Sequence, residues 1–380
     1  MTIYGRTLLA SLLGCFALVS CSEQTGSSVS LPPSEAVDVA PSKLTILSWE
    51  DSIPPEILHK FSEESGIGIE ILFYKNTDEL IGFLKSQPSQ FDVILTDEDT
   101  AARLKERRLL ANFDSQQLPN LINLDPGNLA LLPDSKASYA VPYLMDKTVL
   151  VYDPNRIEPP STNWSLLWDQ KVIGTQRVFM IDEPLEVFAV AHLSLGQSVN
   201  TAKPIEIASA NNLLLDQLNS IDVSYASDSE ILSALIEGKC VAAMLYHSSA
   251  IMVLEQREDM EVILPSEGAA LSCDVLTISA ESEHPEAAHS FLNFMIGADV
   301  AATCAEWNWC PSPNREAIKQ IDPELMNDRI AYPQASILKK CEFHDSGNPE
   351  RIRLVAKYFR ALKDEIAQSE PFAQLDRQRQ

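Results

Sequence analysis

Positive charge is scarce in this 380-residue chain. It holds 29 lysines and arginines against 54 aspartates and glutamates, and its formal net charge is −25. A field of that sign repels phosphate backbones and anionic headgroups, so a nucleic-acid-binding role is excluded. The same field attracts cations over a Debye length of about 10 Å. Acidity alone identifies no ligand, because it also serves solubility.

The signatures of common enzymes and metal proteins are missing. No CxxC pair, HExxH motif, nucleophile elbow or phosphate loop occurs, and His284 and His289 are five residues apart, on different faces of a helix. We therefore expect no enzymatic activity, no metal and no cofactor. A carboxylate pair such as Glu183 and Glu186 could hydrolyse glycosides, so an exported hydrolase stays a minor alternative.

Long apolar runs are missing except at the N-terminus, where residues 8–19 follow a single charge, Arg6. This pattern predicts an export signal over residues 1–20, too short to span a bilayer as a mature helix. Cys21 directly follows Leu-Val-Ser, which resembles the lipobox of bacterial lipoproteins. The resemblance implies acylation of Cys21. The alternative is an ordinary secretory signal with an incidental cysteine.

Loss of the signal removes one cation and no acid, so the charge of −25 becomes −26. Residues 21–42 then form a lipidated, flexible tether rich in serine and proline. We expect an exported protein of the cell envelope, anchored by lipid and facing the periplasm or the cell exterior. The remaining chain is long enough for two domains. Five cysteines stay, an odd number that leaves their pairing open: Cys240, Cys273, Cys304, Cys310 and Cys341.

Short apolar strands alternate with helices along the first part of the chain. We predict strands over 44–48, 70–74 and 91–95, and helices from Pro54 to Gly66, over 78–86 and over 99–108. This alternation predicts a parallel sheet covered on both faces, whose ligands lie beyond the carboxyl ends of the strands. That places Trp49, Glu50 and Asp51 on the same rim as Asp97 and Asp99.

A second unit begins near residue 148. The predicted strands are 148–152, 177–181, 241–245 and 275–278. The predicted helices are 184–195, 206–218, 229–237, 248–257, 284–296 and 350–367.

The order of short motifs resembles the bacterial spermidine/putrescine-binding proteins, the solute-binding subunits of polyamine ABC importers. The motifs are Leu47–Asp51, Pro54-Pro55, Phe61-x-x-Glu64-x-Gly66, Phe91–Val93, Leu124–Pro126, Val141–Tyr143, Trp164-x-x-Leu167-Trp168, Asp182–Phe188, Pro265-x-Glu267-Gly268, Asp274, Asn293-Phe294, Asp299–Ala301 and Pro311–Asn314. The resemblance implies an α/β type II periplasmic-binding-protein fold. It has two lobes, each a mostly parallel sheet flanked by helices, joined by hinge crossover strands. We expect lobe 1 over 43–145 and 275–335, lobe 2 over 146–274 and 336–366, and a polar tail over 367–380.

The resemblance also implies the site. Trp49 and Glu50 match the start of the family's pocket, Glu183 and Glu186 its paired acids, and Tyr246 stands where a stacking tryptophan is expected. Asp274 matches the acid that holds an internal amine. Ammonium groups leaving water need such carboxylates, and methylenes suit aromatic faces. Acids that open a helix could instead merely stabilise its dipole.

Several positions depart from the family pattern. Asp97 and Asp99 replace a serine and a tyrosine, Ser52, Ser272 and Cys310 replace aromatic residues, and a late glutamine is replaced near His344. Lys147 could neutralise one of the acids, and a Cys273–Cys310 disulfide is possible. We expect a monomer that captures a small cation, most simply a polyamine, for ABC permease subunits. A sensor that presents polyamine to a receptor, or the same fold with another cationic or amino-acid-like ligand, stays open.

Overall fold

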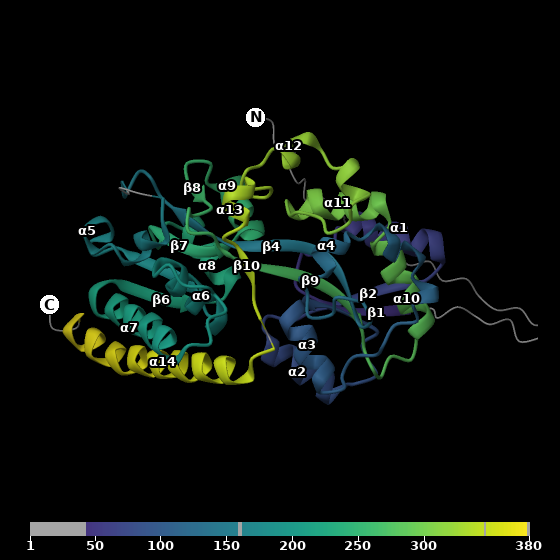
Figure 1. The fold of residues 1–380 in the computed structure, drawn as a ribbon, viewed down its shortest axis with the longest axis horizontal. Coiled ribbons are helices and arrows are strands. Elements are labelled where there is room, and N and C mark those ends of the chain that lie inside the picture. The colour runs from purple at the N-terminus through teal and green to yellow at the C-terminus, as the bar shows by residue number, and fades with distance from the viewer. Residues whose placement is uncertain (1–42, 159–161, 346, 378–380) are drawn as a thin grey trace, which may run out of the picture. The chain divides into compact units, whose positions relative to one another are not determined.

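The computed structural model describes residues 43–158, 162–345 and 347–377 (Figure 1). Its described strands form one sheet in the order β2-β1-β3-β9-β4-β7-β5-β6, to which β8 and β10 add at β4 and β9. Two long antiparallel strands in the middle of this order connect its two halves. The alternation of strands and helices that the sequence predicts is therefore present in both halves.

The first half of the sheet is built on β1 (Lys43–Ser48), which lies parallel to β2 (Gly68–Phe73) and β3 (Val93–Asp97). The helices α1 (Pro55–Ser65), α2 (Thr77–Ser86) and α3 (Glu98–Glu106) follow these strands in turn. Proline at the start of α1 and Gly66 in the left-handed region at its end define that helix as predicted. Because β1 and β3 run in the same direction, Trp49 and Asp97 lie at the same edge of the sheet.

Two strands run through both halves. The first part of β4 (Ala140–Tyr152) pairs with β9 (Ala270–Ile278), whereas its residues 148–152 pair with β7 (Ala242–Tyr246). The other end of β9 pairs antiparallel with β3. A third connection is the short β10 (Glu342–Phe343), which lies beside the start of β9. These crossings place residues of both halves next to one another.

The second half of the sheet places β5 (Arg177–Ile181) between β6 (Asp222–Ala226) and β7, all parallel. β8 (Glu261–Ile263) adds to β4. Helices α6 (Pro184–Ser194), α7 (Pro204–Ser220), α8 (Asp228–Ile236) and α9 (His247–Gln256) surround this half, and α14 (Pro349–Arg377) runs beside α6 and α7 (Figure 1).

The remaining described elements are mostly short. They are η1 (Ser115–Gln117), η2 (Pro119–Asn123), α4 (Pro126–Leu129), η3 (Trp164–Trp168), α5 (Gln170–Ile173), α10 (Pro285–Met295), α11 (Ala298–Asn308), η4 (Ala317–Lys319), α12 (Pro323–Met326) and α13 (Ala335–Leu338). Among the described residues, no helix is both long and apolar enough to cross a membrane.

Separate apolar cores support the two halves. One core gathers buried residues between Val149 and Ala270 together with Val355, Phe359 and Leu362 of α14. Two others gather residues of the first half, one around Phe61 and Phe291 and the other around Phe91. Helix α14, which the sequence predicts over 350–367, therefore packs on the second half.

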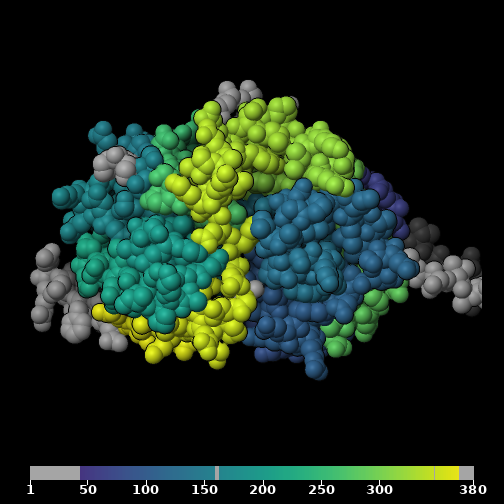
Figure 2. Space-filling model, in the orientation of Figure 1, coloured from purple at the N-terminus to yellow at the C-terminus, as the bar shows by residue number. Residues whose placement is uncertain are grey.

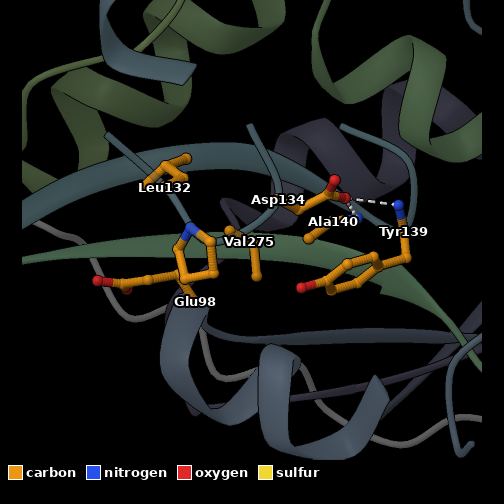
Figure 3. A pocket seen from close by; sticks show the side chains of 7 residues that line it. Glu98, Leu132, Asp134, Tyr139, Ala140 and Val275 are labelled. Atoms are coloured by element: carbon orange, nitrogen blue, oxygen red, sulfur yellow. Dashed lines mark hydrogen bonds between the residues drawn. The ribbon is translucent and has the colours of Figure 1, made fainter. Parts of the chain in front are cut away.

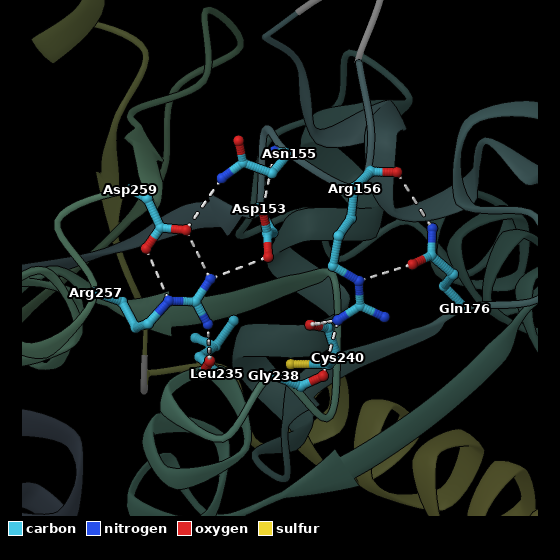
Figure 4. Close-up of polar contacts among 9 residues, drawn as sticks. All are labelled: Asp153, Asn155, Arg156, Gln176, Leu235, Gly238, Cys240, Arg257 and Asp259. Atoms are coloured by element: carbon cyan, nitrogen blue, oxygen red, sulfur yellow. Dashed lines mark hydrogen bonds and ion pairs between the residues drawn. The ribbon is translucent and has the colours of Figure 1, made fainter.

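A polar network fixes the loops at one end of the second half (Figure 4). Arg257, which ends α9, donates to Asp153 after β4 at 3.1 Å and to Asp259 at 2.8 and 2.9 Å. Arg156 donates to the carbonyl oxygens of Gly238 and Cys240 at 2.8 and 3.2 Å. These contacts hold the ends of β4, α8 and α9 together.

Candidate functional site: acids from both halves of the sheet

Two aspartates face each other where β3 ends. Asp97 is the last residue of β3 and lies directly opposite Asp274 in the antiparallel register with β9. Asp97 also caps α3, its Oδ1 accepting a hydrogen bond from the Thr100 N–H at 2.7 Å. Burial, followed by the charges of Asp146 and Asp97, raises the pKa of Asp274 well above its ordinary value. Since like charges opposite each other are destabilising, the pair calls for a cation.

Two glutamates open helix α6 in the second half of the sheet. Glu183 is the residue before the helix, and although part of its side chain is exposed, desolvation and then the charge of Asp97 raise its pKa to about 7. Arg103 opposes this effect. Glu186 is only 5% exposed. The electrostatic effect of Asp97 on Glu183 places acids of both halves in one site.

Tyr246 belongs to the same cluster. It is the last residue of β7, and its N–H donates to Asp228 Oδ1 at 3.4 Å. Burial and then the charges of Glu186, Glu183 and Asp97 raise its pKa well above the ordinary value. An uncharged phenol on which these carboxylates act electrostatically offers an aromatic face and a hydroxyl to a bound cation.

Asp99, in the first turn of α3, is 9% exposed and acts electrostatically on His344, which lies against Glu186. It therefore joins the cluster from the side of the first half. The predicted site residues that the structure brings together are Asp97, Asp99, Glu183, Glu186, Tyr246 and Asp274.

Of the three residues after β1, Trp49 lies beside the acidic cluster, whereas Glu50 and Asp51 lie at the surface. The Trp49 ring packs against Tyr74 with ring centroids 5.5 Å apart, and the charges of Asp97 and Asp274 act on Tyr74. Glu50 and Asp51 are exposed, and among the described residues no hydrogen bond or ion pair joins either carboxylate to the acids of the site. The backbone oxygen of Asp51 accepts a hydrogen bond from Trp307 Nε1 at 2.9 Å. Trp49 thus adjoins the cluster, and the two acids after it do not.

Three residues of the site were missed by the sequence analysis or left without a role. Tyr74 lies beneath Trp49, Asp146 acts on Asp274 from β4, and His344 Nε2 lies 3.0 Å from Glu186 Oε1. The family pattern had indicated a polar group near His344, which was the one usable signal. Asp146 is held by the Ser248 hydroxyl at 2.6 Å, a contact across 102 residues that no local pattern reveals.

Glu98, between the two rim aspartates, has a different position. It is 4% exposed and its Oε2 accepts the Cys273 N–H at 2.7 Å, which fixes α3 to β9 beside Asp274. Figure 3 shows it lining a small pocket with Leu132, Asp134, Tyr139, Ala140 and Val275. Asp134 is occupied there by the N–H groups of Tyr139 and Ala140 at 2.7 and 3.0 Å. None of the residues that line this pocket belongs to the acidic cluster.

The basic and sulfur-containing residues near the site have other partners. Lys147 Nζ donates to the Ala331 carbonyl at 3.2 Å, and Lys147 forms no ion pair within the described part of the chain. Cys273 and Cys310 are buried free thiols, so the disulfide that the sequence left possible between them is not formed. Cys240 and Cys304 are also buried free thiols, and Cys341 is a half-buried one. No group of three or more metal-ligating side chains is found among the described residues. The net result is a site with excess negative charge and aromatic rings at its border.

Comparison with known proteins assigns this arrangement to a family. Residues 56–331 match the family described as bacterial extracellular solute-binding protein. The chain is 29% identical over 323 residues to the spermidine/putrescine-binding periplasmic protein of Escherichia coli, covering 84% of this chain and 91% of that one. It is 26% identical over 338 residues to the putrescine/cadaverine-binding protein of Pseudomonas aeruginosa, covering 85% and 94%.

Solved structures agree on the fold. A putative spermidine/putrescine ABC transporter protein from Listeria monocytogenes superimposes with a TM-score of 0.75 at 25% identity, covering 85% of this chain and 99% of that one. A spermidine/putrescine ABC transporter substrate-binding protein from Streptococcus pneumoniae gives 0.75 at 23%, covering 85% and 98%. The chain therefore belongs to the bacterial extracellular solute-binding proteins and has their type II fold of two lobes joined by crossing strands.

Proposed function

We propose that this protein captures a polyamine between its two lobes and delivers it to an ABC importer. The observation that carries the proposal is the convergence of Asp97 and Asp274 from one half of the sheet with Glu183 and Glu186 from the other. The names of the relatives, which bind spermidine, putrescine or cadaverine, support the same ligand class.

The chemistry of a polyamine fits the cluster. Each ammonium that leaves water needs a carboxylate, and one at about 4 Å supplies roughly 4 kcal/mol at an effective dielectric of 20. Two or three acids offset much of the desolvation. The rings of Trp49, Tyr74 and Tyr246 border the acids and suit the methylenes and the residual charge, at about 0.5–2 kcal/mol for each ring that faces a cation.

Closure of the lobes is the mechanism that we propose, with the ligand shifting the balance between open and closed states. We place the lobes at 43–145 with 275–335 and at 146–274 with 336–366, because the separate apolar cores and the crossing strands β4 and β9 support that division. Catalysis is not part of the proposal. The family is described as solute-binding, and the named relative from Escherichia coli as spermidine/putrescine-binding.

The wider setting follows the same proposal. Acylation at Cys21, which lies outside the described residues, would hold the protein at a membrane surface near the permease subunits, and we expect it to act as a monomer. A sensor that hands polyamine to a receptor would use the same site, so the genes next to this one distinguish import from sensing. Permease and ATPase genes indicate import, and a lone receptor gene indicates sensing.

A thermal-shift screen tests the ligand class. The protein is heated alone and with polyamines, basic amino acids, short cationic peptides and neutral diols of matched length. A ligand at 100 times its dissociation constant adds about 2.7 kcal/mol to stability. We expect putrescine or spermidine to raise the melting temperature and the diols to have no effect. Stabilisation by amino acids alone, with none by polyamines, would overturn the proposed ligand.

A further inference from the structure

The crossing segment, residues 339–345, brings a histidine into the acidic site. The segment contains β10, which pairs with the start of β9, and it continues into α14. Figure 2 shows the yellow segment before α14 lying between the blue and the teal surfaces. His344 Nε2 lies 3.0 Å from Glu186 Oε1, although the two residues are 158 positions apart.

Several contacts fix the segment where His344 sits. Asn200 donates to the Phe343 carbonyl at 2.7 Å and accepts from the Asp345 N–H at 2.8 Å. Arg351 donates to the carbonyl oxygens of Asp345 and Val199 at 3.1 and 2.8 Å. The histidine is therefore held against Glu186 by the main chain on both sides of it, and its position does not depend on the carboxylate.

The contact is buried and incompletely satisfied. His344 is 8% exposed and Glu186 is 5% exposed. Glu186 Oε2 and His344 Nδ1 are buried without a hydrogen-bond partner within the described part of the chain. One oxygen of this buried carboxylate is in contact with the imidazole, and the other is left to accept a hydrogen bond. Glu186 can therefore bind a second cation beside the histidine.

Charged groups face His344 from three helices. Burial lowers its pKa, but Glu186 of α6 and Asp99 of α3 more than offset this and raise the pKa above its ordinary value, with Arg351 of α14 opposing them. Glu342 and Asp345, on the crossing segment itself, act on Arg351. The imidazolium is thus supported by one acid from each lobe.

We propose that protonated His344 is a resident cation of the binding site, which occupies one ammonium position and makes the site prefer a diamine over a triamine. This inference rests on the proposed function. A triamine carries an additional ammonium, which would have to lie near the imidazolium, and like charges in a desolvated site cost several kcal/mol. A diamine of the putrescine type leaves the histidine in place and uses the remaining acids, Asp97, Asp274 and Glu183.

The experiment compares His344→Gln with the wild type. Glutamine keeps a donor for Glu186 but carries no charge at any pH, and His59→Gln is the matched control, because His59 is exposed on α1 next to Glu63. Putrescine and spermidine are each titrated calorimetrically from about pH 5.5 to about pH 8.5, a window that spans histidine titration. The ratio of the two dissociation constants removes the pH dependence that both ligands share through the carboxylates.

We expect the wild type and His59→Gln to prefer putrescine, most strongly at the acid end of the window. His344→Gln is expected to shift the ratio toward spermidine by about tenfold or more and to make it independent of pH. A purely structural role for His344 would weaken both ligands alike and leave the ratio unchanged, which would overturn the inference.

The wild-type ratio is a second readout that does not depend on the variant's folding. If the wild type binds both amines with a ratio that does not change with pH, the inference fails while the proposed function stands. If the wild type binds neither amine, the proposed function fails and the inference fails with it. A preference for putrescine that fades as the pH rises supports the resident cation.

Discussion

Asp274 is the residue on which the proposed binding site depends most directly. It lies opposite Asp97, and the charges that act on its carboxyl group within the described structure, those of Asp146 and Asp97, are both negative. We predict that Asp274→Asn weakens polyamine binding by about 3–5 kcal/mol, because it leaves a desolvated ammonium without its counter-charge. Calorimetric titration measures this loss, which corresponds to a factor of about 100 or more in the dissociation constant.

The matched control for that variant is Asp216→Asn, the same chemical change on the exposed face of α7. It should bind polyamine as the wild type does. Equal affinity of Asp274→Asn and wild type would remove Asp274 from the site.

From the raised pKa of Glu183 we predict that a change of pH has opposite effects on the stability of the ligand-free protein and on its affinity for a polyamine. Desolvation and Asp97 raise its pKa from 4.5 to about 7, so the folded state binds more protons than the unfolded state between these values. The free energy of unfolding of the ligand-free protein should therefore rise as the pH falls through this range. Affinity for a polyamine should fall over the same range, because protonation removes the charge that the ligand needs.

Urea unfolding and calorimetry across this pH range measure the two trends. Glu183→Gln should flatten the part of the stability profile due to this residue, and Glu261→Gln, on the exposed edge strand β8, serves as the control. Stability of the free wild type that rises steadily with pH would contradict the assignment.

Most residues of the candidate site could be predicted because they lie in short motifs that resemble the family pattern, and most of these motifs stand at the end of a strand or the start of a helix. Asp97 ends a strand, Glu183 and Glu186 open a helix, and Tyr246 ends another strand. The contacts of Asp146 and His344 could not be predicted, since their partners lie 102 and 158 residues away. Glu50 was predicted to lie on the same rim of the sheet as Asp97, but it is exposed, because the chain turns toward the surface directly after Trp49.

At the scale of elements, the apolar runs predicted most strands, but the starts of the two crossing strands, β4 and β9, were not predicted. β9 begins at Ala270 rather than near residue 275, so Asp274 lies inside the strand and not at its opening. β4 likewise begins at Ala140, before the predicted 148. Polar residues interrupt both segments, Pro142 lies within β4, and the pairing partners are distant in sequence. β6 was missed because its residues, Asp222–Ala226, mix polar and apolar side chains.

Gly268 lies where the backbone of the crossing segment approaches it closely. Its φ is +97°, and a Cβ there would lie 2.3 Å from the Lys340 carbonyl oxygen. Gly66 also has a positive φ, +73°, but a Cβ there would meet nothing within 4 Å. We predict that Gly66→Ala costs about 1–2 kcal/mol of stability through backbone strain alone, and that Gly268→Ala costs more because the collision adds to the strain.

Urea unfolding of both glycine variants measures this difference. The excess loss in Gly268→Ala reports displacement of the segment that carries His344, so polyamine binding should weaken in that variant and stay unchanged in Gly66→Ala. Equal losses of stability would mean that the segment can shift without cost.

At the scale of the whole molecule, the proposed lipid anchor at Cys21 lies outside the described residues. If Cys21 is acylated, Cys21→Ser should release the protein from membranes or block its processing, because each buried methylene of an acyl chain supplies about 0.8 kcal/mol. Fractionation of cells that express either form measures this. The neighbouring Ser22→Ala should fractionate as the wild type does. Membrane association of Cys21→Ser equal to that of wild type would contradict the lipoprotein assignment.

The central claim is that acids from both lobes meet on a polyamine. Calorimetric titration of the wild-type protein with putrescine and spermidine, against neutral diols of the same length, tests it most directly. The account predicts saturable binding of at least one amine at one site per chain, weakened by added salt because the contacts are ionic. The diols should give no binding heat. Absence of binding by both amines, or diol binding equal to that of the amines, would contradict the claim.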